Sequence, residues 1–289
     1  MIVRLRGREL DVAQPVLMGI VNVTPDSFSD HQGPKDVDEL AARALEQLDD
    51  GAAIVDVGGE SGRTDTEAVP VEEEIARAVP LVERLAARGA LVSVDTWRGP
   101  VARAALEAGA AMINDVSGLT DESIAVACAD TGAALVITHT RAAPKTKAFP
   151  AYDDVVRDAR DFLEERMRAA EALGMAPEQI VLDPGIDLAK TPAQSVALLR
   201  RLPELASLGR PLLLAVSRKD FVGALTERRP AERDAGTLAA VGAAVRGGAS
   251  IIRVHDVAAT RDYLRVQDAL TDGADGALEL AAELKREAV

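Results

Sequence analysis

The sequence predicts an α/β fold, a single-domain (β/α)8 TIM barrel with a short N-terminal hairpin. Short apolar runs rich in Val and Ile alternate with longer amphipathic stretches, as in parallel strands joined by helices. There are eight such runs, and a barrel of this kind needs about 250 residues, which fits a chain of 289. Eight repeats favour closure into a barrel over an open, doubly wound sheet.

The expected elements follow from hydrophobic periodicity. Strands are expected in the apolar runs at 17–22, 53–57, 91–95, 111–114, 133–138, 179–183, 211–216 and 250–254. Helices are expected at 36–50, 70–88, 99–108, 121–131, 154–173, 192–207 and 234–247, with one or two closing helices in 258–288. Residues 1–16 are expected to form a hairpin across the bottom of the barrel. No linker interrupts the chain, so 1–289 is expected to be one domain.

The composition indicates a globular protein with a large core, since 48% of the residues are hydrophobic and 28% are charged. The net charge of −14 makes nucleic acid and anionic membrane surfaces poor partners. A local cationic pocket can still take an anionic small substrate. The single cysteine, Cys128, cannot form an internal disulfide. The N-terminus lacks an apolar signal core, so the cytoplasm is the expected compartment.

Polar residues stand at the end of every predicted strand, where barrels of this type carry their chemistry. For a single strand, an Asn or Asp there could equally be a helix N-cap. That explanation fails for the whole set, because Lys, Arg and His are not N-cap types. A shared polar pocket in the barrel mouth accounts better for Asn22, Asp56, Asp95, Asn114, Asp115, His139, Asp183, Ser217, Arg218, Lys219, Arg253 and His255.

One half of this pocket suits a ring with several hydrogen-bond donors on one edge, such as the pyrimidine half of a pterin. The carboxylates of Asp56, Asp95 and Asp183 can each accept two bonds from such an edge, and charge-assisted bidentate bonds are strong. Asn114 can donate and accept together, and Lys219 can donate to a ring carbonyl or nitrogen.

The other half is cationic, because Arg253 and His255 form a corner suited to a phosphate or pyrophosphate. No phosphate-binding glycine loop, dinucleotide fingerprint or zinc spacing occurs in the sequence. Ser217 has no histidine nearby in the sequence to act as its base, which favours a hydrogen-bond donor over a nucleophile.

At these residues the chain resembles the dihydropteroate synthase family. The run Met-Gly-Ile-Val-Asn-Val-Thr-Pro-Asp-Ser-Phe-Ser-Asp at 18–30 is similar to the first family signature. Asp-Val-Gly-Gly-Glu-Ser at 56–61, followed by Arg63, is similar to the second. Further similar motifs follow in family order at 93–96, 114–118, 183–185, 217–219 and 253–256.

The resemblance implies a transferase of folate biosynthesis. The family displaces pyrophosphate from hydroxymethyl-7,8-dihydropterin pyrophosphate and attaches p-aminobenzoate, with Mg²⁺ accompanying the pyrophosphate. Catalysis of this kind is electrostatic and positional, with no protein nucleophile. The family is commonly dimeric, so the resemblance also implies a homodimer.

The resemblance assigns roles residue by residue. The pterin is assigned to Asp56, Asp95, Asn114, Asp183 and Lys219. The pyrophosphate is assigned to Asn22, Arg253 and His255, with Asn22 near the metal, and p-aminobenzoate to Arg63 and Ser217. Asp30 stands where the family aspartate supports positive charge on the pterin methylene. Asp30, Lys219, Arg253 and His255 are therefore the expected catalytic residues.

The departures from the family gather on the p-aminobenzoate side and in the loops. Aromatic residues alternating with glycine are usual after the sixth strand, where this chain has Ile-Asp-Leu-Ala at 186–189. Gly62 and Thr64 flank Arg63, and Asp220 follows the seventh-strand lysine. Asp187 and Asp220 are expected to repel an anionic aminobenzoate, which Arg63 partly opposes.

Three functions therefore stay open. The first is the synthase itself. The second is a divergent pterin-binding paralogue, similar to a branch found in actinobacteria, that is non-catalytic or acts on another acceptor. The third is a folate-linked methyltransferase, whose pterin domain shares this barrel but needs a corrinoid module that this chain does not supply.

Overall fold

Eight parallel strands form a closed barrel in the computed structural model, which describes residues 1–23, 36–60 and 67–273. The hydrogen-bonded order is β8-β7-β6-β5-β4-β3-β10-β9, and a parallel bridge between Leu182 and Leu212 joins the two outer strands. The strands are β3 (Val16–Asn22), β4 (Ala52–Gly58), β5 (Val92–Asp95), β6 (Met112–Asp115), β7 (Ala134–Thr138), β8 (Ile180–Asp183), β9 (Leu213–Ala215) and β10 (Ile251–Val254). The predicted barrel and all eight predicted strands are confirmed.

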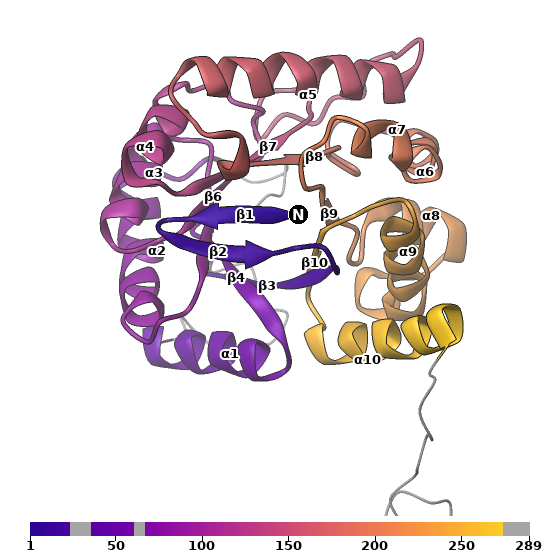
Figure 1. Ribbon diagram of the computed structural model, residues 1–289, viewed down its shortest axis with the longest axis horizontal. Coiled ribbons are helices and arrows are strands. Elements are labelled where there is room, and N and C mark those ends of the chain that lie inside the picture. Colours follow the sequence, from indigo (N-terminus) through magenta and orange to yellow (C-terminus); the bar gives the residue numbers. More distant parts are fainter. Residues whose placement is uncertain (24–35, 61–66, 274–289) are drawn as a thin grey trace, which may run out of the picture.

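The helices surround this ring of strands (Figure 1), as expected for a βα repeat. They are α1 (Val37–Asp49), α2 (Val71–Ala86), α3 (Gly99–Glu107), α4 (Ser123–Thr131), α5 (Val155–Ala172), α6 (Pro192–Arg200), α7 (Leu202–Ala206), α8 (Asp220–Thr226), α9 (Asp234–Arg246) and α10 (Val257–Asp268). The single helix predicted over 192–207 is wrong, because Pro203 opens a second helix there. The short α8 was not predicted, and the tail beyond 273 lies outside the described residues.

The N-terminal hairpin closes the bottom of the barrel, as predicted. Its strands β1 (Ile2–Leu5) and β2 (Arg8–Asp11) pair antiparallel and cross the face nearest the viewer in Figure 1. Val3 and Leu5 are fully buried in a cluster with residues of the barrel interior, including Met18 and Ile54. The turn is held by a bond from the Arg6 amide to the Gly132 carbonyl, 2.7 Å long.

Truncation of Leu5 tests how much this plug stabilises the barrel. Leu5→Ala is expected to lower the free energy of unfolding by about 2–5 kcal/mol, because it removes buried methyl groups and leaves a cavity. Ile2 in the same strand is 39% exposed, so Ile2→Ala is the matched control with a much smaller expected effect. Urea unfolding measures both, and equal losses in the two variants would contradict this packing.

Candidate functional site

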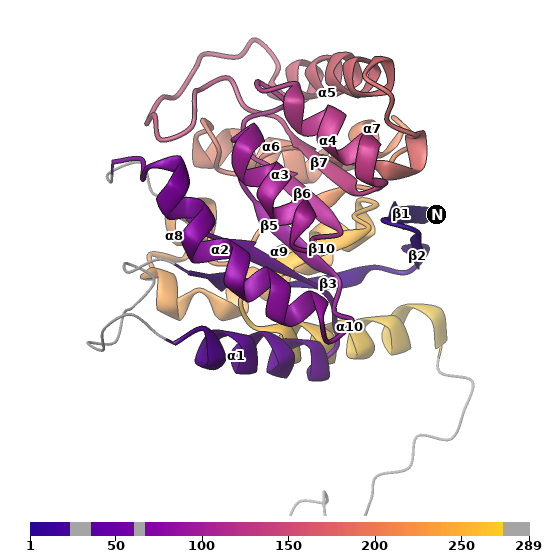
Figure 2. The ribbon, with the colours of Figure 1, turned by 90° about the vertical axis from the view of Figure 1, so that its left-hand side faces the viewer.

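A layer of polar side chains caps the apolar interior of the barrel at the carboxyl ends of the strands. Side chains two positions apart point to the same side of a strand. Four strands use this spacing to place a polar residue above a buried apolar one. The pairs are Ile54 with Asp56, Met112 with Asn114, Val181 with Asp183, and Ile251 with Arg253. The N-terminal hairpin lies at the opposite end of the barrel, on the right in Figure 2.

Arg253 joins two carboxylates across this layer. Its Nε donates to Asp56 Oδ2 at 2.6 Å and its Nη2 donates to Asp95 Oδ2 at 3.2 Å. Asn114 Nδ2 also donates to Asp56 Oδ2, at 3.1 Å. Burial raises the pKa of Asp95, and Arg253 opposes that rise. In the described part of the chain, Oδ1 of Asp56 and Oδ1 of Asn114 are buried acceptors with no hydrogen-bond partner.

Asp183 lies in the same layer, beside two lysines. Its Oδ1 accepts a 2.7 Å bond from the Gly185 amide, and no hydrogen bond from the described residues reaches its second oxygen. Burial raises the pKa of Asp183, while the charges of Lys219 and Lys190 oppose the rise. Burial lowers the pKa of Lys219, and the nearby carboxylates of Asp187 and Asp183 oppose that fall. The charges of Lys219 and Asp183 therefore act on each other, and each favours the ionised form of the other.

Lys190 also lies near Asp183, although the sequence analysis did not predict it as a site residue. Its side chain is buried, and its Nζ donates to the carbonyls of His139 and Leu188 at 3.0 Å. Desolvation lowers the pKa of Lys190 to about 7, with Asp183 opposing the shift. The sequence signal that could have identified it is its position, since Lys190 ends the loop that follows β8.

Ser217 and His255 are in direct contact. Ser217 Oγ lies 2.8 Å from Nδ1 of His255, and the amide of His255 donates to the same Oγ. Desolvation lowers the pKa of His255 to about 4, so the ring is neutral near pH 7. A hydroxyl can donate or accept, so the tautomer of the His255 ring decides which of the two groups donates in this contact. The role of Ser217 as a hydrogen-bond donor stays a prediction, and a histidine, which the sequence does not place nearby, does lie beside it in space.

Two predicted site residues, Asp30 and Arg63, lie outside the described residues. Asn22 is described and ends β3, with its Oδ1 close to the backbone of Gly58, where an added Cβ would lie 2.9 Å from that oxygen. Within 1–23, 36–60 and 67–273, no group of three His, Cys, Asp or Glu residues could hold a metal.

Two strand-end residues do not join the shared pocket, contrary to the expectation that all of them would. His139 follows Thr138 and faces the helix layer, where its Nε2 lies 2.8 Å from Asp158 Oδ1 in α5. Desolvation lowers the pKa of His139 to about 3. Asp115 accepts bonds from the Ser117 and Leu119 amides and so shapes its own loop. Each directly follows an inward-facing residue, so its side chain points to the opposite side of the strand, away from the barrel interior.

Asp187 and Asp220, which are expected to repel an anionic aminobenzoate, both have partners in the structure. The Asp220 carboxylate points outward, with 85% of its side chain exposed, and pairs with Arg233 at 3.0 Å. The Asp187 carboxylate accepts bonds from the Ser195 hydroxyl and from the first amides of α8. The ion pair with Arg233 offsets the charge of Asp220. Neutral donors do not cancel the charge of Asp187, so its repulsion of an anionic acceptor stays a prediction.

The rim of the mouth is held by Arg98. Its guanidinium donates to Glu74 Oε2 at 2.6 Å and to the Val69 carbonyl at 2.8 Å, and lies 2.8 Å from Glu60 Oε2. Glu60 immediately precedes the undescribed segment 61–66, which contains the predicted Arg63. The network therefore fixes both ends of the loop that carries this predicted site residue.

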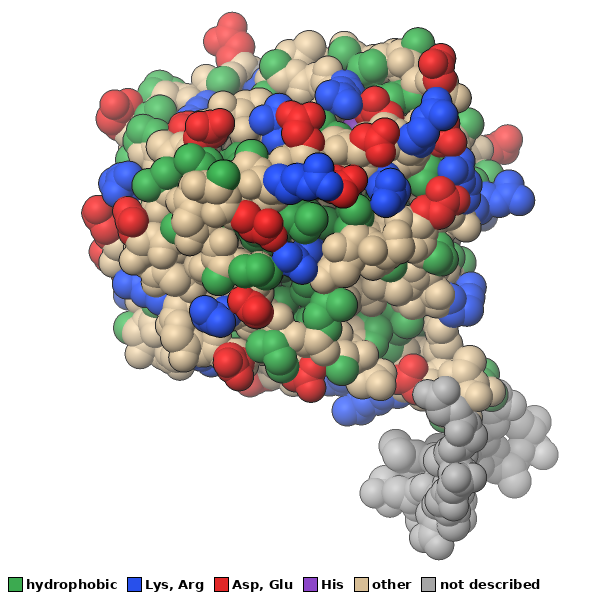
Figure 3. Space-filling model, turned by 45° about the horizontal axis from the view of Figure 1, so that its top comes forward, with side chains coloured by type: hydrophobic (Ala, Val, Ile, Leu, Met, Phe, Trp, Pro, Cys, Tyr) green, Lys and Arg blue, Asp and Glu red, His purple; other side chains and the backbone are tan. Residues whose placement is uncertain are grey.

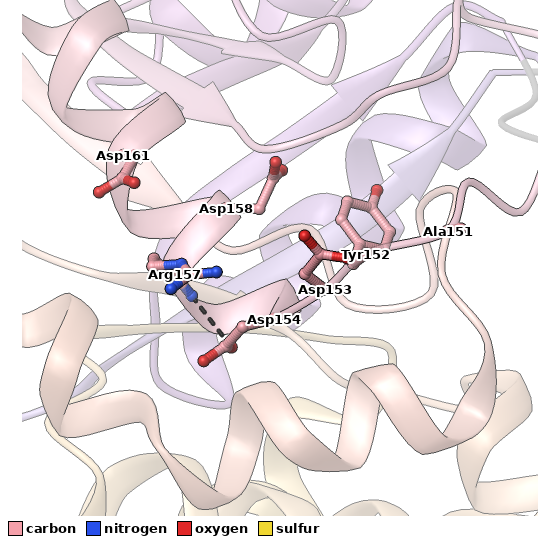
Figure 4. Close-up of a pocket in the computed structure, with 7 residues that line it drawn as sticks. All are labelled: Ala151, Tyr152, Asp153, Asp154, Arg157, Asp158 and Asp161. Atoms are coloured by element: carbon pink, nitrogen blue, oxygen red, sulfur yellow. Dashed lines mark hydrogen bonds between the residues drawn. The ribbon is translucent and has the colours of Figure 1, made fainter.

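A separate cavity of about 280 Å³ lies at the start of α5 (Figure 4) and holds several acidic side chains. Two of these have structural partners, since Asp154 caps α5 and pairs with Arg201, and Asp158 pairs with Arg141. Figure 3 shows acidic and basic side chains interspersed over this side of the molecule. Neither feature competes with the barrel mouth as a candidate site.

Comparisons with known proteins agree with this geometry. Residues 18–255 match the family described as pterin binding enzyme. The dihydropteroate synthase of Synechocystis is 43% identical over 258 residues, covering 88% of this chain and 89% of that protein. The chain belongs to the dihydropteroate synthase family.

Solved structures of dihydropteroate synthases extend the comparison. The Xanthomonas albilineans synthase with 4-aminobenzoic acid is 44% identical, has a TM-score of 0.86, and covers 93% of this chain and 98% of its own. The same enzyme with 7,8-dihydropteroate has a TM-score of 0.83, with 44% identity over 92% of this chain and 98% of its own. The chain is a transferase of this family, and the similarity favours the synthase over a divergent paralogue. In the described residues, no helix is long and apolar enough to cross a membrane.

Proposed function

We propose that the barrel mouth condenses hydroxymethyl-7,8-dihydropterin pyrophosphate with p-aminobenzoate, giving dihydropteroate and pyrophosphate. The observation that carries this proposal is the layer of inward-facing polar residues with unused acceptors above an apolar barrel. Buried polar groups without partners are costly, so their presence indicates a ligand that satisfies them. Asp56 Oδ1 and Asn114 Oδ1 are two such atoms.

The pterin ring is best matched by Asp183, Asn114, Lys219 and the Asp56–Asp95 pair. Asp183 and Asn114 offer acceptors to the amino and N–H donors of the pyrimidine edge. Lys219 offers a donor to the ring carbonyl or nitrogen. Arg253 holds Asp56 and Asp95 in place, so these side chains are oriented before the ligand arrives.

The pyrophosphate is best matched by Arg253, His255 and Asn22. In the tautomer with a proton on Nε2, His255 donates a hydrogen bond to the pyrophosphate, and Arg253 supplies positive charge. Mg²⁺ commonly binds through one or two protein oxygens together with substrate phosphates, which fits the Asn22 amide. When bound, the ion would neutralise part of the charge on the leaving pyrophosphate.

The reaction breaks the C–O bond between the pterin methylene and pyrophosphate and forms a C–N bond to the arylamine, which then loses a proton. Negative charge develops on the leaving group and positive charge on the methylene. Arg253 and His255 stabilise the first, and Asp30 is proposed to stabilise the second. Catalysis is therefore positional and electrostatic, and Ser217 serves as a donor on the p-aminobenzoate side together with Arg63.

Pyrophosphate release tests the proposal. Release is expected to require the pterin pyrophosphate, p-aminobenzoate and Mg²⁺ together, and Lys219→Ala is expected to slow it at subsaturating pterin. Absence of release under conditions that support the Escherichia coli synthase would refute the synthase. Calorimetric binding of pterin without turnover would instead indicate the non-catalytic alternative.

The homodimer and the cytoplasmic location stay predictions. Light scattering during size-exclusion chromatography tests the homodimer.

A further inference from the structure

Asp187 links two loops of the barrel mouth. Its Oδ1 accepts a 2.7 Å hydrogen bond from the Ser195 hydroxyl at the start of α6, and the Asp187 amide donates to Ser195 Oγ at 3.1 Å. Its Oδ2 accepts bonds from the amides of Asp220 and Phe221, the first two residues of α8. The carboxylate thus caps α8 from a different loop, the one that follows Asp183.

Helix α8 has no side-chain cap of its own, because its N-cap residue is Lys219. The first amides of a helix need an acceptor, and a carboxylate also complements the positive end of the helix dipole. Arg233 donates to the carbonyls of Arg218 and Lys219 from the other side. The backbone at Lys219 is therefore held on one side by the Arg233 guanidinium and on the other by the bonds of Asp187 to the first amides of α8.

The conformation of Asp187 indicates that these bonds decide its position. Its φ is 62°, in the left-handed region that favours glycine. Side chains rarely adopt this region unless their contacts compensate for the strain. Here one carboxylate takes three hydrogen bonds from two other segments, so the strained residue is the connection between the β8–α6 loop and α8.

The same carboxylate acts on the charge of Lys219. Asp187 is the strongest of the charges that oppose the desolvation of this lysine, ahead of Asp183. No side chain among the described residues lies within ion-pair distance of the Lys219 ammonium, so it stays available to a ligand. Asp187 thus supports both the place and the charge of a group that the proposed function assigns to the pterin.

We propose that Asp187 is a positioning residue for Lys219, fixing the first turn of α8 so that the ammonium meets the pterin beside Asp183. This inference rests on the proposed role of Lys219 in pterin binding. Asp187 lies outside the predicted pterin site. It acts through Lys219 and does not contact the ligand itself.

Asp187→Gly separates positioning from fold stability, because glycine relieves the left-handed strain while removing the carboxylate. The dissociation constant for hydroxymethyl-7,8-dihydropterin pyrophosphate, measured by calorimetry, is expected to rise about three- to tenfold, the size of effect expected for a lost cap and nearby charge. Asp187→Asn keeps an acceptor for the helix amides and is expected to recover part of the affinity. Glu227→Gln removes an exposed carboxylate at the far end of α8 and is the matched control, with no expected change.

The double variant Asp187→Gly/Lys219→Ala decides whether Asp187 acts through Lys219. Its affinity is expected to equal that of Lys219→Ala within about twofold, because coupled residues are not additive. Wild-type affinity in Asp187→Gly, or full additivity in the double variant, would overturn the positioning role. Wild-type affinity in Lys219→Ala would instead refute the proposed pterin site, and with it this inference. Thermal unfolding of each variant checks that the affinities come from folded protein.

Discussion

Replacing Arg253 with methionine is expected to lower kcat about 10²–10³-fold, the usual cost of removing a preorganised donor from developing negative charge. The same change is expected to destabilise the protein by about 3–5 kcal/mol, because it leaves a buried carboxylate without its partner. Asp56 is fully buried and bonded to Arg253 at 2.6 Å. Steady-state pyrophosphate release and urea unfolding measure the two effects.

The double variant Arg253→Met/Asp56→Asn separates catalysis from stability. Removing the orphaned charge is expected to restore most of the free energy of unfolding, because the remaining amide can still bond to Asn114. Activity is expected to stay low, since the double variant still lacks the Arg253 guanidinium. Near wild-type kcat in the double variant would show that Arg253 only stabilises the barrel.

Much of the barrel could be predicted from the sequence because each strand is a short, continuous apolar run. The strand at 180–183, for example, lies between polar loops and is buried along its whole length. The hairpin was predictable for a similar reason, since residues 1–16 precede the first repeat. The short α8 escaped prediction because its seven residues lack a local cap, and its capping carboxylate comes from Asp187, 33 positions earlier than Asp220.

The site was only partly predictable. Strand ends identified the polar layer, and the two-residue alternation could also have separated Asn114 from Asp115 and Thr138 from His139. The sequence placed Arg253 with the pyrophosphate and Asp56 with the pterin, but their ion pair joins residues 197 positions apart. Such a contact depends on barrel closure, which local patterns do not specify.

Asp183→Asn is expected to weaken pterin binding about ten- to hundredfold, which corresponds to the loss of a hydrogen bond to a charged group. The asparagine can still accept from the Gly185 amide, so the loop is expected to keep its shape. Its amino group, however, would face the ring donors that the carboxylate accepted. Calorimetry with the pterin pyrophosphate measures the loss, and wild-type affinity would place the pterin elsewhere.

The same variant is expected to be more stable than the wild type at neutral pH. Burial raises the pKa of Asp183 in the folded protein above its ordinary value of 3.8. Below that value both states are protonated and the residue contributes nothing. As the pH rises, the unfolded chain loses its proton first, so the folded state is progressively penalised until the pH passes the folded pKa. Asparagine does not ionise, so the variant escapes this penalty.

The stability difference between Asp183→Asn and the wild type should therefore be small near pH 4 and should grow towards pH 7. Urea unfolding at the two pH values measures it, and the other titrating groups largely cancel in the comparison. A gain that is largest at the lower pH would contradict the raised pKa. The expected combination of higher stability and weaker pterin binding follows from one cause: the barrel keeps a carboxylate in a desolvated position where only the ligand donors fully satisfy it.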